Sequence, residues 1–223
     1  MPDLTWTTDL TAAGGLANVT LYRMVAENPT HSDSKIVADK MLVIGRVYSA
    51  AVTRGGGKRN EEEPALPESL YQHLAELVVS VGPDLDDRLR KLGTLDRVSL
   101  SNLSDIADCH RFLASTLVAG INGWRSTSSN RGVHARDSFV SKYLHFHAPQ
   151  AFFILDSIAQ NELKADGMLR WRVRWPADFH KMLRTPYASY CLRLLTYIER
   201  KYPAGVWSPR SVDGRLLGYL PYS

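Results

Sequence analysis

Apolar side chains recur every three or four positions along most of this 223-residue chain, the spacing that places them on one face of an α-helix. One run extends from Leu16 to Val25 and stops before Pro29, and the next follows Ser32 and includes Gly45, which predicts close contact between helices. The pattern predicts helices near residues 16–28, 32–52, 67–81, 84–92, 102–121, 138–148, 156–163, 187–202 and 208–217. We therefore expect an all-α protein of about eight to ten helices, either one domain over 1–223 or two units over 1–100 and 101–223.

Segments without helical periodicity separate the predicted helices. Residues 54–67 read as a surface loop, and their Gly-Gly-Gly-Lys run lacks the Gly-Lys-Ser/Thr ending of a phosphate-binding loop. Residues 151–155 form a short extended apolar run between two helices. Residues 170–176 alternate arginine with tryptophan and valine, which predicts a strand or an irregular surface on which unstacked bases could lie.

Composition adds a weak preference for an anionic partner. The chain carries 27 Lys and Arg against 23 Asp and Glu, a net charge of +4, with a pI near 9.1. Cys109 and Cys191 both fall in apolar helical patterns, which predicts buried, reduced thiols. Because we find neither a basic leader nor an apolar run long enough to span a bilayer, we expect a cytoplasmic protein with no membrane contact.

The candidate chemistry lies in residues 138–159. Lys142 is the one lysine of an otherwise apolar predicted helix, and Asp156 stands at the start of the next helix. If these helices pack antiparallel around the connector 151–155, both side chains can face one cleft. Desolvation would favour a neutral, nucleophilic amine at Lys142, which imine chemistry requires. The helix dipole would keep Asp156 ionised, which suits the stabilisation of a developing cation.

The run Phe153-Ile154-Leu155-Asp156 after a lysine-bearing helix resembles the helix-hairpin-helix DNA glycosylase superfamily, especially bacterial proteins similar to 8-oxoguanine glycosylases. Residues 208–217 also resemble the C-terminal helix of that family. The resemblance implies a cleft between two helical halves, no cofactor, and duplex or single-stranded DNA as the partner. The sequence leaves the oligomeric state open, with a monomer slightly favoured. It implies that Lys142 attacks C1′ of an extruded nucleotide to give a Schiff base, while Asp156 stabilises the oxocarbenium-like sugar.

The same resemblance names further site residues. Candidates for DNA contacts, at and before the lysine-bearing helix, are Arg125, Arg131, Arg136 and Ser138, and candidates for the base pocket are Tyr143, Trp207 and Tyr219. The chain departs from the family at the hairpin, which usually reads Leu-Pro-Gly-Val-Gly, whereas only Arg-Gly-Val stands here at 131–133. The lysine-to-aspartate spacing is also shorter than in the family, by about one helical turn.

Other interpretations of these residues stay open. Lys142 as a helix-surface lysine and Asp156 as a simple N-cap fit a non-catalytic helical module that binds nucleic acid or a protein. Arg174 and His180 have the spacing seen in a family of helical ribonucleases. The two histidines at 145 and 147 point apart on a helix and have no nearby acidic or cysteine partner, so we expect no metal.

Overall fold

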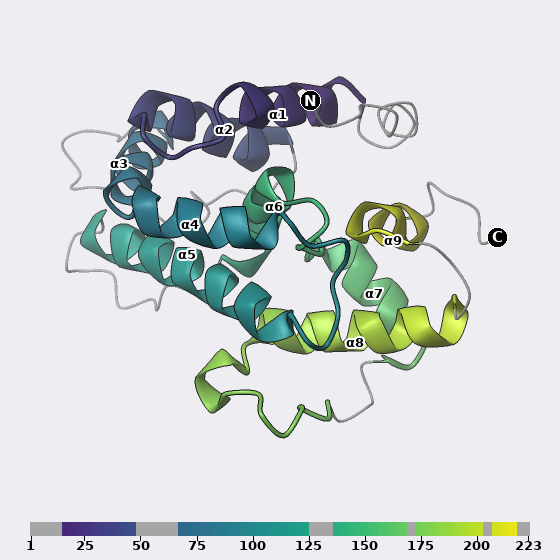
Figure 1. Ribbon diagram of the computed structural model, residues 1–223. Coiled ribbons are helices and arrows are strands. Elements are labelled where there is room, and N and C mark those ends of the chain that lie inside the picture. The colour runs from purple at the N-terminus through teal and green to yellow at the C-terminus, as the bar shows by residue number, and fades with distance from the viewer. Residues whose placement is uncertain (1–14, 48–66, 125–135, 169–172, 203–206, 218–223) are drawn as a thin grey trace.

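The fold is taken from a computed structural model that describes residues 15–47, 67–124, 136–168, 173–202 and 207–217 (Figure 1). These residues form nine α-helices and one 3-10 helix and contain no strand, which confirms the predicted all-α class. In chain order the elements are α1 (Gly15–Glu27), α2 (Ser34–Val47), α3 (Pro67–Ser80), α4 (Gly82–Leu92), α5 (Leu103–Trp124), α6 (Asp137–His147), α7 (Ser157–Ala165), η4 (Lys181–Leu183), α8 (Pro186–Lys201) and α9 (Pro209–Leu216). None of the described helices is long and apolar enough to cross a membrane.

Local sequence signals set where several helices begin. Asp156 is the N-cap of α7, as predicted, and its side chain accepts the N–H of Ile158. Ser208 caps α9 through a capping box with Ser211, and Pro209 occupies the first turn, where a missing N–H costs nothing. The sequence therefore specifies the starts of α7 and α9.

Close packing of α2 on α3 depends on Gly45. A Cβ atom at this position would overlap the hydroxyl of Tyr71, so a larger residue would push the two helices apart. The predicted close helix contact at Gly45 is therefore confirmed.

Helix α6 lies in the middle of the molecule, with α1 and α2 above it and α5 beside it (Figure 1). At the other end of the connector, α7 packs on both α8 and α9. The buried apolar residues form one cluster that runs from Leu21 to Leu216. Cys109 and Cys191 lie inside it as free thiols, and burial raises the pKa of each to about 12, so both are unreactive.

Two expectations for the segments between helices have different outcomes. Residues 151–155 are buried, as predicted, with Ala151 in a turn and 152–155 outside regular secondary structure. Residues 173–176 are irregular rather than a strand, while 169–172 and the predicted loop 54–66 lie outside the described residues.

Candidate functional site

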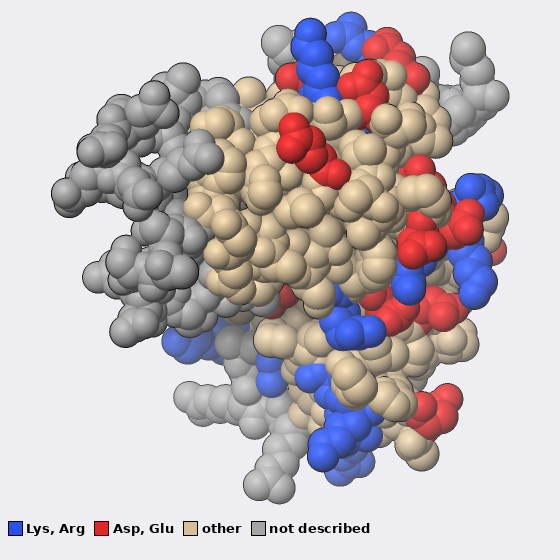
Figure 2. Space-filling model, turned by 90° about the vertical axis from the view of Figure 1, so that its left-hand side faces the viewer, with Lys and Arg blue, Asp and Glu red and all other residues tan. Residues whose placement is uncertain are grey.

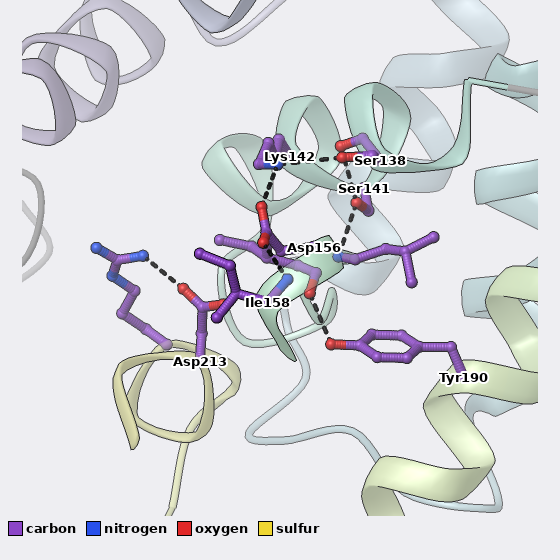
Figure 3. Close-up of polar contacts among 10 residues, drawn as sticks. Ser138, Ser141, Lys142, Asp156, Ile158, Tyr190 and Asp213 are labelled. Carbon is purple, nitrogen blue, oxygen red and sulfur yellow. Dashed lines mark hydrogen bonds and ion pairs between the residues drawn. The ribbon is translucent and has the colours of Figure 1, made fainter. Parts of the chain in front are cut away.

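Lys142 and Asp156, predicted to share a site, are in direct contact. The Lys142 ammonium donates to Asp156 Oδ2 at 3.0 Å and to the hydroxyl of Ser138, one turn earlier on α6, at 3.1 Å (Figure 3). The lysine side chain is only 4% exposed, whereas that of Asp156 is 24% exposed. Solvent therefore reaches the pair from the carboxylate side.

The surroundings of Asp156 favour its ionised form. Partial burial raises its pKa, but the Ile158 N–H and the Lys142 charge together outweigh burial, and the net pKa lies below its ordinary value. Asp156 Oδ1 accepts the Ile158 N–H at 2.8 Å while Oδ2 faces Lys142. Each carboxylate oxygen thus has its own partner, and the side chain holds one orientation.

Side chains from α6 and α8 fix the connector that delivers Asp156. A buried extended segment has no neighbouring strand for its backbone, so its polar groups need other partners. Four side chains supply them. Three donate to connector carbonyls: His145 to Phe152 at 2.8 Å, Tyr187 to Phe153 at 2.9 Å and Tyr190 to Ile154 at 2.8 Å. The fourth, the hydroxyl of Ser141, accepts the Leu155 N–H at 3.0 Å. Asp156 therefore follows an anchored segment rather than a free loop.

Asp213 of α9 is a second acidic side chain at this site, and sequence analysis missed it. It is 4% exposed, accepts from Arg210 at 2.9 Å through Oδ2, and has no hydrogen-bond partner for Oδ1 among the described residues. Figure 3 shows it beside Asp156. Burial raises the pKa of Asp213 to about 6; Arg210 and Lys142 oppose that rise, and Asp156 adds to it. In sequence, Arg210 and Asp213 resemble an ordinary surface i, i+3 ion pair.

The remaining predicted site residues fall into three groups. Ser138 is a partner of Lys142, so it belongs to the site itself. Arg136 directly precedes α6, and Trp207 is half-buried and stacks on Phe153 with ring centroids 5.8 Å apart. The candidates Arg125, Arg131 and Tyr219 lie outside the described residues.

The prediction that Tyr143 lines a base pocket is wrong. Its side chain is 0% exposed, and its ring packs against His31, Phe139 and His147. Adjacent residues on a helix diverge by about 100° around its axis, so Tyr143 enters the core although Lys142 faces Asp156. No base can stack on a ring enclosed in this way.

The histidines of α6 serve different neighbours. His145 contacts the Phe152 carbonyl and, at 2.9 Å, the hydroxyl of Tyr22, and burial lowers its pKa to about 3, which keeps it neutral. His147 bonds the Tyr143 carbonyl and faces the ammonium of Lys40 at 3.3 Å. In the described part of the chain, no group of three histidine, cysteine or acidic side chains could hold a metal ion.

Lys40 of α2 is a second buried lysine that sequence analysis did not single out. Its side chain is fully enclosed, and its ammonium donates to the carbonyl of Asn28. Burial lowers the pKa of Lys40 to about 8, with Asp86 opposing the change. It provides an internal comparison for Lys142.

Comparisons of this chain with protein-family models, with curated proteins and with solved structures found no match. Function is therefore inferred from the geometry of the site and from the resemblance of residues 138–159 to the glycosylase superfamily.

Proposed function

We propose that this protein is a DNA glycosylase with AP lyase activity and that Lys142 is its nucleophile. The observation that carries the proposal is the 3.0 Å contact between the Lys142 amine and the Asp156 carboxylate, delivered from two successive helices. Imine formation at a sugar carbon needs an amine to attack and an anion to stabilise the positive charge that develops on the sugar. The pair supplies both groups.

The reaction would begin with a nucleotide rotated out of the stack, at a cost of a few kcal/mol that is smallest for a damaged base. Lys142, once deprotonated, forms a bond to C1′ as the glycosidic bond breaks, and the base leaves with the bonding electrons and gains a proton. The nitrogen then loses a second proton, the bond from C1′ to the ring oxygen breaks, and that oxygen takes up a proton, which gives the imine. β-Elimination removes a proton from C2′ and breaks the bond between C3′ and its phosphate oxygen, so the 3′ phosphate leaves.

Two carboxyl groups with opposed pKa shifts suit the two roles that these steps require. Asp156, with a pKa below the ordinary value, stays ionised and stabilises the sugar cation. Asp213, with a pKa of about 6, can take up and return protons near neutral pH. The anchored connector keeps Asp156 in place without reorganisation during the reaction.

One observation favours a second candidate, a non-catalytic helical module that binds nucleic acid or a protein. Lys142 is almost fully buried, and its ammonium already has a carboxylate and a hydroxyl as acceptors. A structural ion pair would have this geometry too. Only the nucleophile, however, forms a covalent bond with substrate.

Borohydride trapping distinguishes the two candidates. The substrates are duplex and single-stranded oligonucleotides that carry 8-oxoguanine, uracil or an abasic site. We expect a covalent adduct with wild-type protein and with Lys40→Met, and none with Lys142→Ala. Because removal of one partner from a buried pair can cost about 3–5 kcal/mol, Lys142→Arg, which keeps the charge, serves as a second variant, and circular dichroism monitors folding. If wild type forms no adduct with any substrate, the binding module is the better function.

A further inference from the structure

Two cavities of similar size differ in how their charges are balanced. One, of about 650 Å³, lies along α4 and α5 and is lined by four aspartates and three basic residues. Its Arg90 pairs with Asp87 at 2.6 Å, and Arg88 pairs with Asp108. The carboxylates of this cavity therefore neutralise its cations, and the cavity attracts an external anion only weakly.

The other cavity, of about 600 Å³, is lined by three arginines and by no acidic residue among those described. Arg174 comes from the segment before η4, and Arg193 and Arg200 lie two turns apart on α8. Arg174 and Arg193 make no ion pair or hydrogen bond within the described part of the chain, and the Arg193 Nε is buried. Three guanidinium groups around one cavity repel one another unless an anion lies between them.

The surface view agrees with this contrast. On the face in Figure 2, Lys and Arg side chains gather toward the bottom, at the level of α8 and the segment before it in Figure 1. At the level of α4, basic and acidic side chains alternate. On this face, Lys and Arg side chains are thus concentrated at the level of α8.

The arginine-lined cavity is separate from the Lys142 site. Neither Lys142, Asp156 nor Asp213 is among the described residues that line it. A ligand bound in this cavity is therefore held by other side chains than those of the Lys142 site.

We propose that this cavity binds a nucleotide unit, with its phosphate between the three arginines and its base against the apolar wall. That wall is formed by Leu100, Met168, Val173 and Leu192. Guanidinium groups bind phosphate in planar, often bidentate contacts. Several guanidinium groups around one site suit the charge of a phosphate better than the single charge of a carboxylate. A volume of about 600 Å³ falls in the range of small-molecule sites and exceeds what phosphate alone would fill. The unit can be a free nucleotide or one residue of a single strand.

The test measures fluorescence anisotropy of a labelled, lesion-free single-stranded oligonucleotide with full-length protein. We expect Arg193→Gln and Arg174→Gln each to weaken binding by about tenfold. Each should also reduce, by about one, the slope of the logarithm of the binding constant against the logarithm of the salt concentration. Arg90→Gln removes the same charge from the balanced cavity and should change affinity by less than about twofold. Because the oligonucleotide carries no lesion and no abasic site, its binding involves no imine chemistry at Lys142, so failure here is distinct from failure of the trapping experiment.

Competition identifies the source of the nucleotide. Displacement of the oligonucleotide by thymidine monophosphate supports a free nucleotide as ligand, and resistance to it, with the arginine variants still defective, supports a strand. Three results would overturn the proposal: no binding by wild type, equal loss in Arg90→Gln, or displacement by inorganic phosphate at the same concentrations as by the nucleotide.

Discussion

Two lysines are buried in the described part of the chain, Lys142 and Lys40, and they have opposite surroundings. Lys142 faces a carboxylate that is 24% exposed, and a second acidic side chain, Asp213, lies close by. Lys40 is fully enclosed, and its ammonium contacts the carbonyl of Asn28 and the ring of His147. Both lysines lie on helices of the core, yet among the described residues only Lys142 has a carboxylate in contact with it.

The contrast shows that burial alone does not make a reactive lysine. Burial lowers the pKa of Lys40 to about 8, which would make its amine a good nucleophile if a substrate could reach it. No route leads to a fully enclosed side chain, and no carboxylate contacts it to stabilise a sugar cation. Lys142 has that carboxylate in place, and solvent reaches the carboxylate.

The largest expected effect is on chemistry at the two lysines. Lys142→Ala should lower the rate of base excision by about 10³-fold or more, because it removes the nucleophile. Lys40→Met should leave that rate within about twofold of wild type, since Lys40 contacts no substrate. Single-turnover excision from a lesion-bearing oligonucleotide measures both. A comparable loss in the two variants would remove the distinction between the lysines.

The next effect concerns the carboxylates near each lysine. Asp156→Asn keeps an N-cap for α7 but removes the charge beside Lys142, so excision should slow by about 10²-fold or more. Asp86→Asn breaks the bond from the His31 backbone N–H at 3.1 Å and should lower the melting temperature without slowing excision. Excision rates and thermal melts of both variants provide the check. Wild-type rates in Asp156→Asn would contradict the role given to this carboxylate.

The sequence predicted this site better at some residues than at others. Apolar periodicity and turn residues predicted the helices, and the N-cap position of Asp156 follows from local rules. The same periodicity does not mark Lys40 as buried, because α2 also carries Lys35 and Arg46 and its three cations look alike in sequence. Asp213 and the tyrosines of α8 reach the site only through long-range packing, and no local pattern marks them. Tyr143 was misassigned because its neighbour in sequence faces another way.

A smaller effect appears in stability at alkaline pH. An unfolded lysine binds its proton up to a pKa near 10.4, whereas folded Lys40 loses it near 8. Between these values the unfolded state binds more protons, so Lys40 makes stability rise with pH. The stability of Lys40→Met relative to wild type should therefore fall by on the order of 3 kcal/mol between pH 7.5 and 10.5.

Chemical denaturation at several pH values measures this difference. Cys109 and Cys191, whose pKa values are raised by burial, act in the opposite direction over the same range. They are present in both proteins, so their contributions cancel in the comparison. A difference that does not change with pH would show that Lys40 titrates normally.

The smallest expected effect comes from Asp213. With a pKa of about 6, its carboxyl is mostly protonated at pH 5 and mostly ionised at pH 7. If it accepts a proton from Lys142, the single-turnover rate should rise about tenfold across this range, since only the ionised form can act as a base. Asp213→Asn removes this group, so its rate should lose that rise while the borohydride adduct still forms. A pH profile in Asp213→Asn that matches wild type would mean that another group accepts the proton and that Asp213 only fixes Arg210 at the 2.9 Å contact.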